Sequence, residues 1–265
     1  MKIGIIVVNF NNAGHTEKMV ASVASIAGGH DVDFVIVDNA SQITDFNYLK
    51  RLESSVIKIR IISSKTNLGY FNGLNLGLKS LTGSYDYVMV ANNDLILESD
   101  FFRQLQVMSF HDDVAVIAPN IITLDGVQQN PLCVQRMSKI RKAGLKIYYI
   151  NYYFGNFIYS IRKIYNKLTR KAVHNCPSQY IYMGIGAAYI LTPLFFDKMK
   201  VLPTDVFLWS EEALLGGRLA AEKLKMWYES KIILHHAENS STSKMPSRKV
   251  YFIAKESFHK TYKYY

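Results

Sequence analysis

Residues 85–94 read YDYVMVANND, in which an apolar run passes directly into two asparagines and an aspartate. The run predicts a buried strand over 85–91, because strands covered on both faces are apolar almost throughout. Asn92, Asn93 and Asp94 then stand at its carboxyl end, which is where ligands bind in α/β sheets. These three side chains form either a turn or part of a site, and the rest of the sequence has to decide between them.

Apolar runs and helix-patterned segments alternate along the first 120 residues. The expected strands besides 85–91 are 3–8, 33–38, 56–62 and 114–119, and the expected helices are 15–26, 73–81 and 99–110, the last with Ser99 as its N-cap. Strands that are apolar and separated by helices predict a mostly parallel, Rossmann-like α/β sheet with helices on both faces.

Four consecutive strand ends carry Asn, Asp, Ser or Gly. They are Asn9, Asn11 and Asn12; Asp38, Asn39 and Ser41; the segment 63–75; and Asn92, Asn93 and Asp94. One such end is ordinary turn chemistry, but four at the same edge of a sheet indicate a polar pocket. The sequence lacks a P-loop and has no G-x-G-x-x-G after the first strand, which argues against a P-loop NTPase and a nicotinamide or flavin enzyme.

The composition describes a globular chain with one basic block. The chain has 265 residues, is 49% hydrophobic and carries a net charge of +10. Cys133 and Cys176 match neither a metal spacing nor a disulfide framework, and no apolar run approaches the roughly 18 residues of a membrane span, so we expect a cytoplasmic protein. No acidic residue lies between Asp125 and Asp197, whereas ten cations do: Arg136, Lys139, Arg141, Lys142, Lys146, Arg162, Lys163, Lys167, Arg170 and Lys171. This block indicates a local anionic partner.

Several motifs together resemble the inverting family-2 glycosyltransferases of the GT-A fold. They are VVNFNN, VIVDNAS, NLGYFNGLNLGL and VANNDLIL, followed by GIGAAYILTPLFFDKM (184–199), FLWSEEALLGGRL (207–219) and ILHHAENSST (233–242). The match covers about residues 1–125 and 180–245, and is greatest to the rhamnosyltransferase-like members that build bacterial surface polysaccharides. The resemblance implies sugar transfer from a nucleotide-diphosphate donor to a glycan acceptor, which is commonly lipid-linked.

The resemblance also implies roles for the residues at the strand ends. Asp94 would hold a divalent cation, Mg²⁺ or Mn²⁺, against the donor diphosphate, with His235 completing its shell and His236 in reserve. The two asparagines before Asp94 resemble the "NND" variant, in which the protein's own hold on the metal is weak. The nucleotide sugar would be bound by Asn9, Asn11, Asp38, Asn67, Gly69, Asn72, Asn92 and Asn93.

The pair Glu211-Glu212 stands where the family has Glu-Asp, so Glu212 takes the place of the general base with Glu211 beside it. The extra methylene moves the carboxylate by about 1.5 Å. The alternative is a plain helix start, with Ser210 as N-cap and two acids favoured by the helix dipole. Gly184 and Trp209 are assigned to the acceptor side, where Trp209 either stacks on a sugar or fills the core.

Residues 126–180 lie outside the family pattern and predict a helical insertion, broken near Gly155. Its apolar residues recur at spacings of three and four, with tyrosines between them: Ile140, Ala143, Ile147, Ile150, Phe154, Phe157, Ile161, Ile164 and Leu168. Such a helix suits an anionic membrane surface, contacted through 136–171. The alternative is a helical hairpin or a seam between copies of the chain. Nucleic acid is not expected, because no binding motif accompanies the charge.

We therefore expect a single GT-A domain over 1–265, peripheral on the inner face of the cell membrane. Its parts are a nucleotide-sugar-binding half (1–120), the basic aromatic insertion (126–180), an acceptor and catalytic half (181–245) and a basic tail (246–265). The rival is a catalytically inactive relative that binds glycans or serves as a scaffold, because Glu-Glu and Asn-Asn-Asp depart from the family's usual residues. A nucleotidyltransferase would need a glycine- and arginine-rich loop after the first strand, which is missing.

Overall fold

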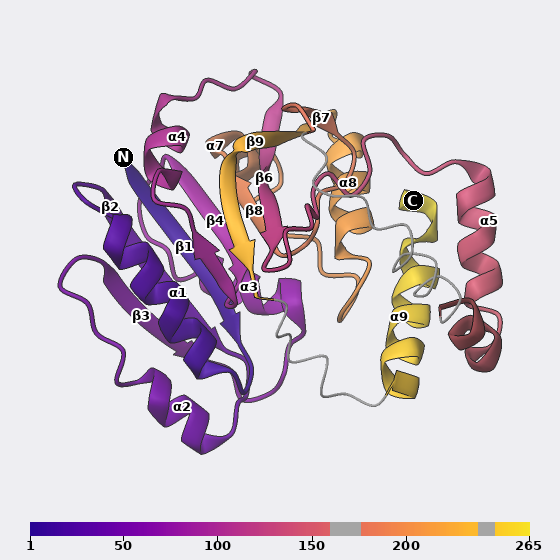
Figure 1. Ribbon diagram of the computed structural model, residues 1–265, viewed down its shortest axis with the longest axis horizontal. Coiled ribbons are helices and arrows are strands. Elements are labelled where there is room, and N and C mark those ends of the chain that lie inside the picture. Colours follow the sequence, from indigo (N-terminus) through magenta and orange to yellow (C-terminus); the bar gives the residue numbers. More distant parts are fainter. Residues whose placement is uncertain (160–175, 238–246) are drawn as a thin grey trace.

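A computed structural model gives the fold and describes residues 1–159, 176–237 and 247–265 (Figure 1). Within these ranges the centre is one nine-stranded sheet in the order β3-β2-β1-β4-β8-β6-β9-β5, with β7 also paired to β9. The strands are β1 (Lys2–Asn9), β2 (Asp31–Asp38), β3 (Lys58–Ser63), β4 (Tyr87–Asn92), β5 (Leu95–Leu97), β6 (Val114–Thr123), β7 (Gln179–Ile181), β8 (Ala188–Leu191) and β9 (Lys225–His236).

The sheet is mixed, with parallel pairing along most of its length. β3, β2, β1 and β4 are parallel neighbours, and β6 is parallel to β9. β8 runs antiparallel between β4 and β6, and β5 and β7 pair antiparallel with β9. The carboxyl ends of β1, β2 and β4 therefore meet at one edge, since parallel strands end on the same side.

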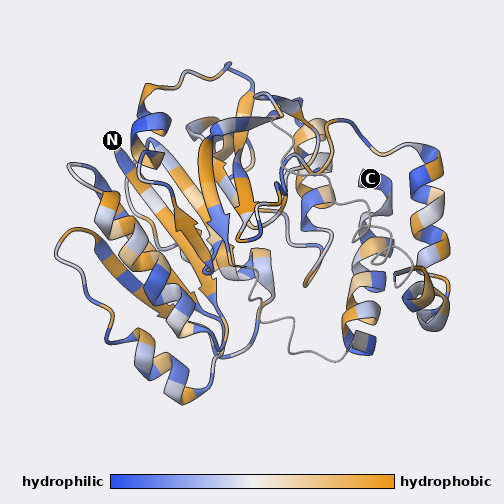
Figure 2. Cartoon of the chain, viewed as in Figure 1, coloured by the Kyte–Doolittle hydropathy of each residue, from blue (hydrophilic) through white to orange (hydrophobic). Residues whose placement is uncertain are grey.

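Helices cover both faces of the sheet, each over its own apolar core. On one face α1 (Ala13–Ile26), α2 (Ile43–Leu49) and α4 (Phe101–Val107) pack through residues such as Met19, Leu49 and Phe101. On the other face α3 (Tyr70–Leu78), α7 (Pro193–Lys198) and α8 (Glu211–Ala221) contribute Phe71 and Leu215 among others. Figure 2 shows the apolar strands between helices of mixed polarity. The α/β architecture expected from the sequence is confirmed.

All five expected strands and all three expected helices of the first 120 residues are present, with shifted ends. The helix expected over 99–110 is shorter, and its N-cap is Asp100 rather than Ser99. The Asp100 carboxylate accepts hydrogen bonds from the side chains of Arg103 and Gln104, which ties it to the first turn of α4. The short α2 and β5 were not expected.

A group of helices lies beyond α8 at one side of the molecule (Figure 1). It contains α5 (Lys139–Tyr148), a helical stretch over 152–159, α9 (Ser247–Thr261) and the 3-10 turn η2 (Tyr262–Tyr264). The expected break near Gly155 lies earlier, at 149–151, because Gly155 itself is helical and packs against Tyr251. The Tyr149 ring stacks on Phe258 of α9, and the rings of Tyr148 and Tyr149 lie tilted against Tyr251.

The apolar side of this insertion is exposed. Ile140 has 84% of its surface exposed, and Ile147, Ile150, Phe154 and Phe157 are exposed as well. The remaining seam positions, Ile161, Ile164 and Leu168, and the cations over 162–171 lie outside the described residues. Among the described helices, none combines the length and apolar character needed to cross a membrane.

Candidate functional site

Asn9, at the end of β1, joins the ends of three strands. Its side-chain Nδ2 lies within hydrogen-bond distance of Asp38 Oδ1 (3.2 Å) and Asp45 Oδ2 (2.7 Å), and its Oδ1 accepts from Asn93 Nδ2 (3.1 Å). Thr16 Oγ1 also donates to Asn9 Oδ1 (3.0 Å). Asn9, Asp38 and Asn93 are each less than 10% exposed. The structure thus brings together residues from β1, β2 and β4, as their positions at strand ends predicted.

These amides are engaged mainly with one another, so they form the frame of the site. Asp45 and Thr16 belong to that frame and were missed in the sequence. Asp45 lies in the first turn of α2, where an acid is expected for the helix dipole alone, and Thr16 lies inside α1. Neither position carried a signal beyond ordinary helix chemistry.

A second cluster ties the end of β2 to the segment before α3. Asn39 Nδ2 donates to Asn67 Oδ1 and to the carbonyl of Gly69, both at 3.0 Å, and its Oδ1 accepts from the Leu68 nitrogen at 2.8 Å. Gly69 has φ +83°, and a Cβ there would stand 2.2 Å from the carbonyl oxygen of Phe207. Only glycine fits at this close approach between the segment before α3 and the segment before α8.

The other expected donor residues lie around the same edge. Asn11 adopts φ 54°, and its nitrogen donates to Ser41 Oγ (2.9 Å). Asn72 is half-buried in the first turn of α3. The nitrogen of Asn92 donates to the carbonyl of Ala187 (2.8 Å), which links the end of β4 to the loop before β8.

Asp94 and His236 face each other at the edge of the sheet. Register pairs Leu95 on β5 with His236 on β9, and His236 Nε2 comes within 3.2 Å of Asp94 Oδ1. Both residues are less than 10% exposed, yet both Asp94 carboxylate oxygens and His236 Nε2 make no hydrogen bond to any described part of the chain. Buried groups of this kind are costly unless something pairs with them.

The imidazole of His236 is arranged to offer a lone pair. Its Nδ1 lies 2.9 Å from Gln129 Oε1. An amide oxygen accepts only, so this contact places the proton on Nδ1 and leaves Nε2 free to coordinate. Across the described residues no third His, Cys, Asp or Glu joins the pair to complete a metal cluster. The donor set therefore fits a divalent cation whose remaining ligands come from substrate phosphates and water.

The structure places His236 rather than His235 beside Asp94. Successive side chains of a strand point to opposite faces, so only one of the two histidines can meet Asp94. His235 Nε2 instead lies 2.5 Å from Glu98 Oε1. His236, the reserve, is the one beside Asp94.

Glu211 and Glu212 begin α8 in a buried environment. Burial raises the pKa of the Glu211 carboxyl to about 8, with the nearby Glu212 charge adding to it, and Glu211 Oε1 has no hydrogen bond among the described residues. Burial also raises the pKa of Glu212, whose Oε1 accepts from the nitrogen of Gly186 (3.1 Å). Ser210 occupies the N-cap position of α8 without a side-chain capping bond, and both acids lie in the first turn, as the helix-start alternative also expects.

Tyr70 shows that Asp94 and the glutamate pair share one neighbourhood. Its hydroxyl donates to the carbonyl of Gly186 (2.9 Å). Burial raises the pKa of Tyr70 well above 10, and the negative charges of Glu211, Asp94 and Glu212 raise it further. The proposed cation ligand and the proposed base therefore both lie close enough to Tyr70 for their charges to act on it.

The two residues assigned to the acceptor side, Gly184 and Trp209, lie in different surroundings from each other. Gly184 is buried, and a Cβ there would stand 2.8 Å from the Ala118 side chain, so it serves packing against β6. The glycine that faces the Glu212 carboxylate is Gly186. Trp209 is half-buried and adopts φ 63°, next to Ser210 at φ 68°.

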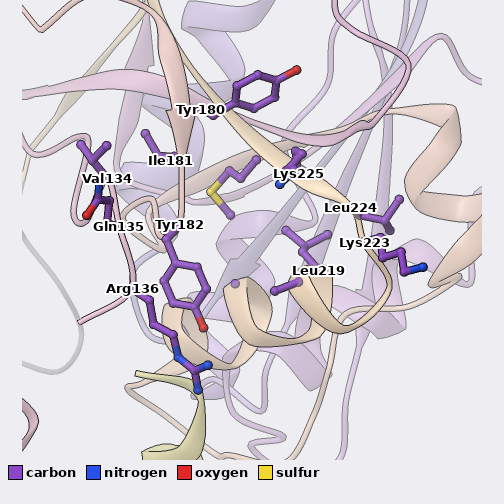
Figure 3. A pocket seen from close by; sticks show the side chains of 13 residues that line it. Val134, Gln135, Arg136, Tyr180, Ile181, Tyr182, Leu219, Lys223, Leu224 and Lys225 are labelled. Carbon is purple, nitrogen blue, oxygen red and sulfur yellow. The ribbon is translucent and has the colours of Figure 1, made fainter. Parts of the chain in front are cut away.

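A hollow of about 350 Å³ lies away from these residues (Figure 3). Its lining includes Arg136, Tyr182, Lys223 and Lys225, between α8 and the start of β9. His236 is at the other end of β9, so the length of that strand separates this hollow from the candidate site.

Comparison with known proteins places these features in a family. The family model described as "Glycosyl transferase family 2" matches residues 4–181. Low-salt glycan biosynthesis hexosyltransferase Agl10 of Haloferax volcanii is 26% identical over 145 residues, which are 54% of this chain and 44% of that protein. An uncharacterized glycosyltransferase of Haemophilus influenzae is 25% identical over 83 residues, 31% of this chain and 25% of that protein. Each match spans less than half of the relative's own length.

Solved structures share the fold at low sequence identity. S. aureus TarS in complex with UDP has a TM-score of 0.59 at 12% identity, over 89% of this chain and 60% of that one. Mannosyltransferase PcManGT from Pyrobaculum calidifontis, in complex with GDP-Man and Mn²⁺, has a TM-score of 0.59 at 14% identity, over 99% of this chain and 68% of that one. The GT-A-like fold is shared with both.

Proposed function

This chain belongs to glycosyl transferase family 2, and we propose that it transfers a sugar from a nucleotide-diphosphate donor to a glycan acceptor with inversion. The observation that carries the proposal is the Asp94–His236 pair. Both groups are buried, face each other at 3.2 Å and lack hydrogen bonds to the described chain at the facing atoms. That arrangement fits a divalent cation held against a diphosphate.

Donor binding falls to the strand ends. The nucleoside is expected over Asp38 and the main chain near Asn11, with the diphosphate beside Asp94 and the sugar near Asn67–Asn72. Asp94 and His236 would hold Mg²⁺ or Mn²⁺, which when bound offsets the charge of the leaving diphosphate. Support comes from Asn39, which fixes the 67–69 segment against β2 through three hydrogen bonds.

In the proposed reaction Glu212 removes the proton from an acceptor hydroxyl. The acceptor oxygen forms a bond to the anomeric carbon as the bond from that carbon to the diphosphate oxygen breaks on the opposite face. The nucleoside diphosphate leaves with the bonding electrons, and Glu212 keeps the proton. A raised pKa suits this role, because a base with a pKa nearer to neutrality transfers protons more effectively.

The finer proposals concern subtype, acceptor and location. The Asn-Asn-Asp motif supports a rhamnosyltransferase-like enzyme of surface polysaccharide synthesis. The cations of 126–180 and the exposed Ile140, Ile147 and Phe157 support a lipid-linked acceptor at an anionic membrane surface on the cytoplasmic side. The rival use of these residues is a seam between copies of the chain.

Turnover and donor choice test the main proposal together. Thermal shift with uridine, thymidine and guanosine diphosphosugars identifies the donor, and product formation is then followed with Mn²⁺, Mg²⁺ or chelator. We expect cation-dependent turnover with at least one donor. Absence of turnover under every condition, with donor binding retained, would instead favour the inactive glycan-binding relative.

Vesicle sedimentation tests the membrane proposal separately. We expect binding to vesicles that contain anionic lipid, weakened by salt and by the paired substitutions Lys139→Glu and Arg141→Glu. Matched charge reversals at Lys18 and Lys50, which are exposed on α1 and at the end of α2, serve as the control. Binding that ignores lipid charge and salt contradicts the proposal, and chain dimers lost on Phe157→Ser would support the seam.

A further inference from the structure

The C-terminal residues reach the loop that precedes the glutamate pair. The hydroxyl of Tyr265 donates to Ser210 Oγ at 2.8 Å, and Ser257 Oγ on α9 donates to the carbonyl of Leu208 at 2.6 Å. Ser210 is the residue immediately before Glu211 and Glu212. The side chains of Tyr265 and Ser257 thus bond to two of the three residues that directly precede α8, Ser210 and Leu208.

This loop needs external support. Trp209 and Ser210 both adopt left-handed backbone conformations, at φ 63° and 68°, although neither is glycine or asparagine. Such conformations persist only where surrounding contacts enforce them, and they occur often at functional sites. Since Ser210 makes no side-chain cap to α8, its hydroxyl is available to Tyr265.

Tyr265 is itself anchored from several directions. Arg136 donates to the main-chain oxygens of Lys263 and Tyr265, and the Tyr182 hydroxyl donates to that of Tyr264. The Tyr264 ring packs on Gly217 of α8, where a Cβ would come within 2.2 Å of it. The Tyr265 ring lies 5.6 Å from that of Phe258. The phenol is therefore held at a defined place relative to α8.

The charges of the glutamates also act on the Tyr265 phenol. Burial raises the pKa of Tyr265 to about 12, and the charges of Glu212 and Glu211 add to that rise. The phenol is neutral at physiological pH and can act as a hydrogen-bond donor. Its charge coupling to both carboxylates places it in their neighbourhood.

We propose that Tyr265 is a positioning residue for the transfer reaction. Its hydroxyl holds Ser210 in place and so sets the orientation of the Glu212 side chain in the first turn of α8. The inference rests on the proposed function, because it takes Glu212 as the base. Tyr265 moves no proton in this scheme and acts only through Ser210. Ser210 lies two residues before the proposed base, so a contact to it can fix the position of that base. A displacement of a catalytic group by about 1 Å can lower the rate of reaction by about 10²-fold.

The test is a double-mutant cycle with Tyr265→Phe and Ser210→Ala. Tyr265→Phe removes only the hydroxyl, and Ser210→Ala removes its partner. We expect each to lower kcat about tenfold with the donor KM unchanged. The double variant should be no worse than Tyr265→Phe, since the Tyr265–Ser210 hydrogen bond is lost in all three variants and the contact of the phenol with Thr261 is lost in both variants that carry Tyr265→Phe. Tyr262→Phe is the control, because that ring lies in the 3-10 turn just before Tyr265 and contacts Phe258 and Lys146 instead of Ser210.

Amide hydrogen exchange gives a readout that needs no turnover. Tyr265→Phe should speed exchange in the peptide spanning 208–214 and leave β1 unchanged, while Tyr262→Phe should do neither. Equal exchange and equal kcat in wild type and Tyr265→Phe would overturn the inference, as would additive losses in the cycle. A wild-type protein without turnover but with the exchange effect would refute the proposed function and leave the positioning contact standing.

Discussion

His236 Nε2 lies 3.2 Å from Asp94 Oδ1 across the paired ends of β5 and β9, with no hydrogen bond between them. Because Nδ1 of this imidazole faces an amide oxygen, Nε2 presents a lone pair, and the facing carboxylate oxygen presents lone pairs to the same space. A positive charge is the natural occupant of such a space, and this relationship leads to the first prediction.

Asp94→Asn and His236→Gln should each weaken binding of Mn²⁺ in the presence of nucleoside diphosphate by at least about tenfold. The reason is the loss of a charged or a nitrogen ligand from a site that has few protein ligands. Isothermal titration with Mn²⁺ measures the effect. His235→Gln is the matched control, since its ring contacts Glu98. Loss of binding in His235→Gln with retention in His236→Gln would reverse the assignment.

Glu212→Gln should lower turnover by about 10²–10⁴-fold while donor binding persists, because the amide cannot accept the acceptor's proton. Steady-state rates and donor titrations measure the two parts. Glu222→Gln, an exposed acid just past the end of the same helix, should behave as wild type. Unchanged turnover in Glu212→Gln would remove this residue from the mechanism.

Gly69→Ala should destabilise the fold by about 2–4 kcal/mol and weaken donor binding, because the new Cβ meets the Phe207 carbonyl at 2.2 Å and φ is +83°. Urea unfolding and donor titration measure the two effects. Gly14→Ala lies in α1 with open space around its Cβ and should be neutral or slightly stabilising. Equal stability of the two variants would contradict this account of Gly69.

Glu211 should make stability fall as pH rises. Its folded-state pKa of about 8 lies above its ordinary value of 4.5, so its contribution is complete below pH 4.5 and is lost as pH rises toward 8. The upper limit is about 1.4 kcal/mol per pH unit in this window. Urea unfolding at pH 5.5 and 8 should therefore show a smaller decline for Glu211→Gln than for wild type, and identical declines would refute the assignment.

The sequence predicted the sheet and the gathering of Asn9, Asp38 and Asn93, because apolar runs mark buried strands and parallel strands end together. It could not choose between His235 and His236. That choice depends on the register of β9 against its neighbours, because register decides which of the two side chains points to the face of the sheet that carries Asp94. The β6–β9 ladder also shifts register between Pro119 and Asn120. Such a shift arises from pairing between distant segments and leaves no local trace.

Other features of the site also could not be predicted from the sequence alone. Gly184 and Gly186 are two residues apart, and only the packing of β6 and α8 decides that the second faces Glu212. The left-handed backbone at Trp209 and Ser210 contradicts the local preference of both residues. The contact from Tyr265 joins segments that are 55 residues apart, which no spacing rule anticipates.

The place of β8 in the sheet has a consequence for biogenesis. β4 and β6 are close in sequence, yet each hydrogen-bonds to β8, which begins only at Ala188. As the chain emerges from the ribosome, the backbone groups of β4 and β6 that pair with β8 have no hydrogen-bond partner until Leu191 has been synthesised. Nascent or truncated forms that stop before that residue would present bare strand edges, which invites self-association.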